Sequence, residues 1–126
     1  MTTGNFSSAA FGWAAIVTAA AAILAIVFLS LMAAVNPAFG RVNDVFNSLI
    51  GIASLVLAWM LYVKFQAGLL PLGRIGLALA VVGAILTIVG SILILFGYTG
   101  FVLAGWYTGI GNALIGLWLA IFCAAM

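Results

Sequence analysis

The sequence has almost no side chains that carry charge or bind metals. Its 126 residues include no histidine, one acidic residue and three basic residues, so charged residues make up only 3% of the chain. The charged side chains are those of Arg41, Asp44, Lys64 and Arg74. Without histidine the chain lacks the usual general base and the commonest metal ligand, and one aspartate cannot form a carboxylate pair. We therefore expect no enzymatic activity, no cofactor and no metal site.

Cysteine and positive charge are too scarce for two further classes of function. The single cysteine, Cys123, lies in an apolar C-terminal segment. It cannot form an internal disulfide or a multi-cysteine metal site, and we expect it to be a small buried hydrophobe. The net charge of +2 comes from the lack of acids. It gives no polycationic surface, so we expect no nucleic-acid partner.

Apolar residues are what the chain has in excess. Hydrophobic residues make up 69% of the sequence, and the mean hydropathy is +1.51, whereas soluble domains are about half apolar. A membrane-spanning helix needs about 20 mostly apolar residues. Polar or Gly/Pro-containing breaks divide the chain into four such segments, at about 9–35, 45–65, 75–96 and 101–126. The sequence therefore predicts an all-α integral membrane protein, in a bacterial-type inner membrane if the source is prokaryotic.

The connections between these segments predict how the helices are arranged. All three are short: "NPAFGRVND" and "QAGLLPLGR" contain proline and glycine, and "GYTG" is a tight polar turn. Short connections make sequential helices run antiparallel. We therefore predict one domain over residues 1–126, an up-down-up-down four-helix transmembrane bundle.

The few cations predict the orientation of this bundle. Lys64 and Arg74 flank the second connection, whereas Arg41 in the first is partly offset by Asp44. Cytoplasmic loops carry an excess of lysine and arginine. We therefore expect the second connection and both termini to be cytoplasmic.

Small residues recur at helical spacing in the predicted spans. In the third span glycines follow one another at intervals of seven, and in the fourth, small residues alternate at intervals of four and three. The predicted helix-packing seam consists of Gly76, Gly83, Gly90, Gly105, Gly109 and Gly116. Small residues let helix backbones approach closely in lipid, and an average period of 3.5 residues favours left-handed supercoiling. The pattern predicts a left-handed bundle with small-residue packing.

Four polar residues are expected near mid-depth in the bilayer, each on the small-residue stripe of its span. They are Thr18, Ser54, Thr87 and Asn112. We expect them to form a buried polar cluster near the bundle axis whose hydrogen bonds join the helices. The alternative is a site for a neutral solute or a lipid headgroup. Against that alternative, closely packed small-residue stripes leave no cavity of about 300 Å³ or more.

Together these patterns predict a non-enzymatic integral membrane protein. We expect a structural or accessory subunit of a larger membrane complex, or a homo-oligomer, whose partners are membrane lipid and other membrane subunits or copies of itself. The alternative is a small transporter or channel for an uncharged solute, with Asn112 and Thr87 contacting that solute.

Overall fold

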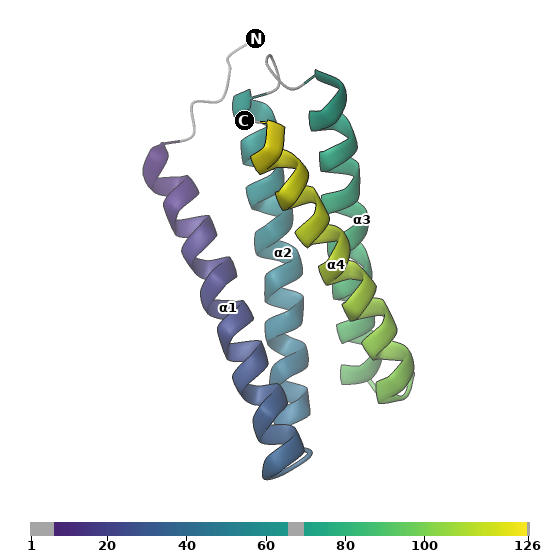
Figure 1. Ribbon diagram of the computed structural model, residues 1–126. Helices are drawn as coiled ribbons and strands as arrows, with labels where there is room; N and C mark the ends of the chain where they lie inside the picture. Colours follow the sequence, from purple (N-terminus) through teal and green to yellow (C-terminus); the bar gives the residue numbers. More distant parts are fainter. Residues whose placement is uncertain (1–6, 66–69, 126) are drawn as a thin grey trace.

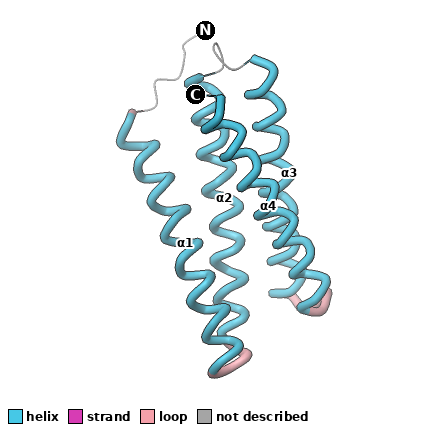
Figure 2. The backbone as a smooth tube through the Cα atoms, viewed as in Figure 1, coloured by secondary structure: helices cyan, strands magenta, loops and turns pink. Residues whose placement is uncertain are grey.

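Four long helices make up the part of the chain that the structure, a computed structural model, describes, residues 7–65 and 70–125 (Figures 1 and 2). They are α1 (Ser8–Ala34), α2 (Phe39–Phe65), α3 (Leu70–Leu95) and α4 (Phe101–Ala125). Each is long and apolar enough to cross a membrane. The prediction of an all-α chain with four helices long and apolar enough to span a membrane is confirmed.

Two helices begin earlier than the hydropathy pattern predicts. Helix α2 begins at Phe39 rather than at residue 45, and α3 begins at Leu70 rather than at residue 75. A helix of 27 residues is about 40 Å long, whereas the hydrocarbon core is about 30 Å thick. Hydropathy selects only segments about as long as the hydrocarbon core is thick, so the first residues of α2 and α3 fall outside those segments. Arg41 and Asp44, expected in the first connection, therefore lie within α2.

Local hydrogen bonds explain where the helices begin and end. Between α1 and α2, the side-chain oxygen of Asn36 accepts the backbone N–H of Ala38 at 2.8 Å. At the end of α3, Gly97 has a positive φ of 73°, and the N–H of Tyr98 donates to the carbonyl of Leu93 at 2.8 Å. This is the glycine-ended arrangement that satisfies the last carbonyls of a helix. Residues 66–69 of the second connection and Met126 lie outside the described residues.

The helices pack in chain order. Figure 1 shows the chain reversing direction between consecutive helices. Helix α1 packs against α2, α2 also packs against α3, and α3 packs against α4, while the backbones of α2 and α4 come close at only a few positions. Within the described ranges the backbone of α1 comes close to neither α3 nor α4. The arrangement therefore has an open side between α1 and α4.

The buried apolar residues form two separate clusters. One joins α2, α3 and α4 and consists of Ala58, Ala80, Ile115 and Trp118. The other joins α1 to α2 through Ala21, Ala25 and Ile50. The rings of Phe28 and Phe46 stack beside this second cluster, with centroids 5.6 Å apart. Helix α1 is thus held by its own small core, separate from the one that holds the other three helices.

The glycines of α3 lie against α4. A Cβ atom added at Gly83 would come within 2.6 Å of the carbonyl oxygen of Gly111, and one at Gly90 within 2.6 Å of the Cβ of Tyr107. A Cβ atom at Gly76 would come within 3.0 Å of the Trp118 ring. Small residues thus meet where Gly83 lies against Gly111 and where Gly90 lies near the carbonyl of Ala104, whereas Gly76 faces the Trp118 ring.

The predicted glycines of α4 lie elsewhere. Added Cβ atoms at Gly105, Gly109 and Gly116 would meet nothing within 4 Å. The α4 glycine that touches α3 is Gly111, which is buried against the Thr87 hydroxyl and the Gly83 carbonyl. The predicted stripe on α4 is therefore turned away from α3, because side chains such as that of Trp118 fill the space beside the α3 glycines.

The position of the cysteine also differs from expectation. Cys123, which we expected to be buried, is exposed near the end of α4. The neighbouring Phe122 is buried instead and packs on Phe65 of α2 with ring centroids 5.8 Å apart. Adjacent helical positions point in different directions, so burial of the larger ring turns the thiol outward.

Candidate functional site

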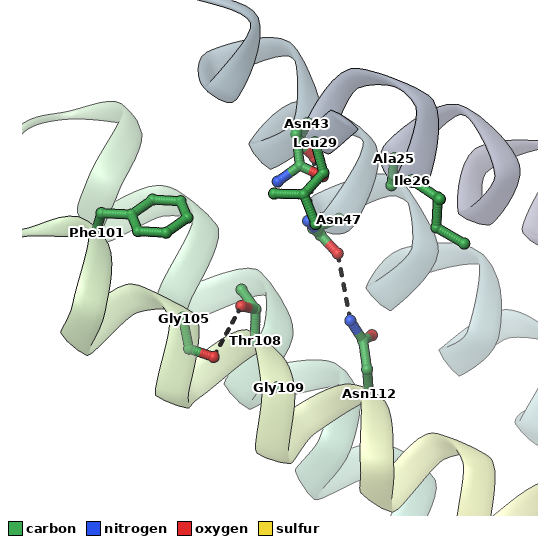
Figure 3. A pocket seen from close by; sticks show the side chains of 10 residues that line it. All are labelled: Ala25, Ile26, Leu29, Asn43, Asn47, Phe101, Gly105, Thr108, Gly109 and Asn112. Carbon is green, nitrogen blue, oxygen red and sulfur yellow. Dashed lines mark hydrogen bonds between the residues drawn. The ribbon is translucent and has the colours of Figure 1, made fainter. Parts of the chain in front are cut away.

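The open side between α1 and α4 contains a groove of about 310 Å³ (Figure 3). Helix α1 contributes Ala25, Ile26 and Leu29; α2 contributes Asn43 and Asn47; and α4 contributes Phe101, Gly105, Thr108, Gly109 and Asn112. Its volume is at the lower end of the range for small-molecule pockets. The expectation that close packing leaves no cavity of this size is wrong, because α1 and α4 do not contact each other.

Two of the predicted α4 glycines that do not contact α3 form part of a wall of this groove. Gly105 and Gly109 line it from α4, and the space beside each is open to a distance of 4 Å from an added Cβ atom. Because glycine has no side chain, the helix backbone itself forms the wall at these positions. These glycines widen the groove and take no part in the contact with α3.

A chain of side-chain hydrogen bonds runs from the groove into the interior. The Asn112 amide nitrogen donates to the side-chain oxygen of Asn47 at 3.3 Å, as Figure 3 shows. The Asn112 oxygen accepts from the buried hydroxyl of Thr87 at 3.4 Å. The Asn47 amide in turn donates to the backbone carbonyl of Asn43 at 3.1 Å. These bonds connect α2, α3 and α4 at one end of the groove.

The asparagines retain hydrogen-bonding capacity. A carboxamide nitrogen carries two N–H donors, and the bonds above use one each from Asn47 and Asn112. The Asn43 nitrogen donates to Asp44 at 3.5 Å. Among the described residues, the second N–H of each of these three amides has no protein acceptor. An unpaired polar group in hydrocarbon costs several kcal/mol, so the groove favours an occupant that carries acceptor oxygens.

The structure brings together two of the four predicted polar residues. Thr87 and Asn112 are hydrogen-bonded to each other. Thr18 instead donates to the carbonyl of Ala14 in its own helix at 2.8 Å. Ser54 is buried, and its hydroxyl has no hydrogen-bond partner in the described part of the chain. A hydroxyl on a helix can bond the carbonyl four residues earlier, as that of Thr18 does, and then needs no partner on another helix.

Two residues of the groove lay outside the predicted cluster. Asn43 falls in a segment that hydropathy assigns to the first connection, and Asn47 belongs to the small-residue stripe of the second span. Both lie on α2 and line the groove. Their spacing of four residues places them on one face of a helix, and this spacing is the sequence signal that could have identified them.

Charged groups are absent from the groove lining. Arg41, Asp44, Lys64 and Arg74 all lie outside the lining set. Asp44 is buried on α2 beside Asn43, and the Lys64 ammonium lies 4.6 Å from the centre of the Phe11 ring, joining the end of α2 to the start of α1. The groove thus presents neutral donors and apolar walls, an arrangement suited to binding an uncharged molecule.

Comparisons with protein-family models, curated proteins and solved structures give no match to this chain.

Proposed function

We propose that this chain is a non-enzymatic integral membrane protein that serves as a structural or accessory subunit of a larger membrane complex, or assembles with itself. The observation that carries this proposal is the position of α1, which packs against α2 alone within the described residues. Its membrane-spanning stretch is the least buried of the four. A helix with a single neighbour has most of its surface left for lipid or for a helix of another subunit.

The proposed arrangement in the membrane is an antiparallel, left-handed up-down-up-down bundle with cytoplasmic termini. One observation supports this arrangement: toward one end of the molecule in Figure 1 lie the start of α1, the end of α2, the start of α3 and the end of α4. Lys64 lies in the last turn of α2, and Arg74 lies near the start of α3. This distribution supports the assignment of that end to the cytoplasm.

Native mass spectrometry of the protein extracted in mild detergent tests the assembly. A subunit gives a reproducible complex of fixed stoichiometry, with a mass above the 13.0 kDa of one chain. The variant Ala19→Trp, on the exposed surface of α1, should weaken assembly, and Ala113→Trp, on the exposed surface of α4, is the matched control. A lone chain in lipid nanodiscs, with or without the substitution, would contradict the proposal.

A second candidate function is the binding or passage of an uncharged solute. It is favoured by one observation, the groove with three asparagine amides and no charged side chain. Asn112 is its central residue because it bonds to both Asn47 and Thr87. Passage is tested by the swelling rate of protein-containing vesicles in glycerol or urea. Rates equal to those of protein-free vesicles would rule out passage of these solutes.

A further inference from the structure

We infer that the groove between α1, α2 and α4 binds an uncharged amphiphile with carbonyl or hydroxyl oxygens, which enters from the bilayer. This inference deepens the second candidate function by naming the ligand class and the route of entry. It is independent of whether the chain assembles with other subunits. Three properties of the groove support this inference: its hydrogen-bond donors, the lack of charged side chains in its lining and its position along the helices.

The donors select a ligand with acceptor oxygens. The Asn47 and Asn112 side chains bond to each other at 3.3 Å, and each retains an N–H with no acceptor among the described residues. Asn43 lies one helical turn from Asn47, is buried and lines the same groove. An ester, ketone or hydroxyl oxygen placed beside these amides would accept the donors that hydrocarbon leaves unpaired.

The lack of a cation in the lining disfavours an anionic headgroup. Asp44 is the charged residue nearest in sequence to the groove asparagines; its carboxylate accepts the Asn43 amide at 3.5 Å, and it lies outside the lining set. Arg41, the nearest cation in sequence, also lies outside the lining set. A phosphate placed in the groove would therefore lose water without gaining a cationic partner, which is unfavourable in a medium of low dielectric constant. The walls opposite the amides are apolar, formed by Ile26 and Leu29 on α1 and Phe101 on α4. They match the alkyl part of an amphiphile.

The position of the amides suits a small headgroup. At about 1.5 Å of rise per residue, Asn47 lies about 12 Å from the start of α2, and Asn112 about 16 Å from the start of α4. The helices exceed the hydrocarbon thickness by about 5 Å at each end. Both amides are therefore about 7 to 11 Å inside the hydrocarbon. A neutral glycerol ester reaches this depth at lower cost than a charged phospholipid headgroup, because it has less hydration to lose.

The route of entry follows from the helix packing. Helices α1 and α4 supply opposite walls of the groove, and no contact between these two helices closes it within the described residues. Part of the α4 wall is formed by the glycines at 105 and 109, which have no side chain to obstruct the opening. An acyl chain can remain in the bilayer between α1 and α4 while the headgroup lies against the asparagines.

Photo-crosslinking in vesicles tests this inference. The full chain is reconstituted in phosphatidylcholine containing a diacylglycerol probe with a diazirine in the acyl chain near the glycerol. After illumination, labelled peptides are located by mass spectrometry. We expect labelling concentrated on the α1 and α4 residues of the groove, with competition by unlabelled diacylglycerol and none by phosphatidic acid or by free glycerol.

Two glycines of α4 provide a matched pair of variants. Gly109→Leu fills the groove, and Gly116→Leu makes the same change on α4 outside the groove lining, where an added Cβ also meets nothing within 4 Å. We expect Gly109→Leu to reduce groove labelling about tenfold or more and Gly116→Leu to leave it unchanged. Asn112→Ala should weaken competition by about two- to tenfold, the effect of one lost hydrogen bond. Thermal unfolding of each variant confirms that it is folded.

The outcomes of these experiments distinguish binding of a lipid in the groove from the second candidate function, passage of an uncharged solute. Equal labelling of both glycine variants, uniform labelling of all lipid-facing helices, or equal competition by phosphatidic acid would overturn the inference. Competition by free glycerol together with faster swelling in glycerol would support a water-soluble solute instead, so the inference would fail while the second candidate function stood. Specific labelling without faster swelling would support the lipid site and reject solute passage.

Discussion

The side chains of Asn112 and Asn47 form a hydrogen bond of 3.3 Å between α4 and α2, two helices whose backbones come close at only a few positions. The same Asn112 side chain accepts a bond from Thr87 of α3. A single amide therefore connects three helices where the groove reaches its polar end. Removal of this side chain affects packing and the groove together.

We predict that Asn112→Ala lowers the unfolding free energy in detergent by about 1 kcal/mol, a typical value for interhelical hydrogen bonds in membranes. Asn47→Ala should have a similar effect. Because the two amides bond to each other, the double variant should cost less than the sum of the single variants. Purely additive effects would show that the two side chains do not interact.

The contact of α3 with α4 predicts a strong effect at Gly83. A Cβ atom there would lie 2.6 Å from the Gly111 carbonyl oxygen and 3.0 Å from an Ile115 side-chain carbon. Gly83→Leu should therefore destabilise the protein by about 2 kcal/mol or more through overpacking. Val82→Leu is the control, since Val82 is exposed and should change stability by less than about 0.5 kcal/mol. Equal melting temperatures for both variants would contradict the contact.

The charge distribution predicts the topology. Reporters fused to either terminus should report the cytoplasm, because Lys64 in the last turn of α2 and Arg74 near the start of α3 lie at the end of the molecule where α1 begins and α4 ends. Two lysines inserted after Pro37 should invert the orientation if lysine and arginine decide it. An external signal from a C-terminal fusion to the unmodified chain would reverse the assignment.

The sequence was sufficient for the coarse architecture because long apolar segments have few alternatives in a bilayer. It was less informative about which face of a helix packs. On α3, the glycines at intervals of seven indicate the face that contacts α4. On α4, glycine occurs on two faces of the helix. Only the packing of Tyr107, Gly111 and Trp118 against the α3 glycines shows that the face with Gly111 is the one in contact. Which face packs depends on how the side chains of the two helices fit together, and the sequence of either helix alone does not show it.

The candidate site was predictable in part for a related reason. Asn112 and Thr87 are polar residues at mid-depth, and lipid provides no alternative hydrogen-bond partners for the amide. Thr18 had a local alternative, the carbonyl of Ala14, and uses it. The groove itself depends on the absence of contact between α1 and α4, a tertiary property that periodicity within single helices does not encode.

The most direct test of this account compares Gly111→Ala with Gly109→Ala in thermal unfolding, because the groove exists only if α4 turns residue 111 toward α3 and residue 109 toward α1. An added methyl at Gly111 would collide with the Thr87 hydroxyl and the Gly83 carbonyl, whereas one at Gly109 would meet nothing within 4 Å. We predict that Gly111→Ala lowers stability by about 1 to 3 kcal/mol and that Gly109→Ala leaves it unchanged or slightly higher. Destabilisation by Gly109→Ala with a neutral Gly111→Ala would contradict the rotation of α4 and, with it, the groove.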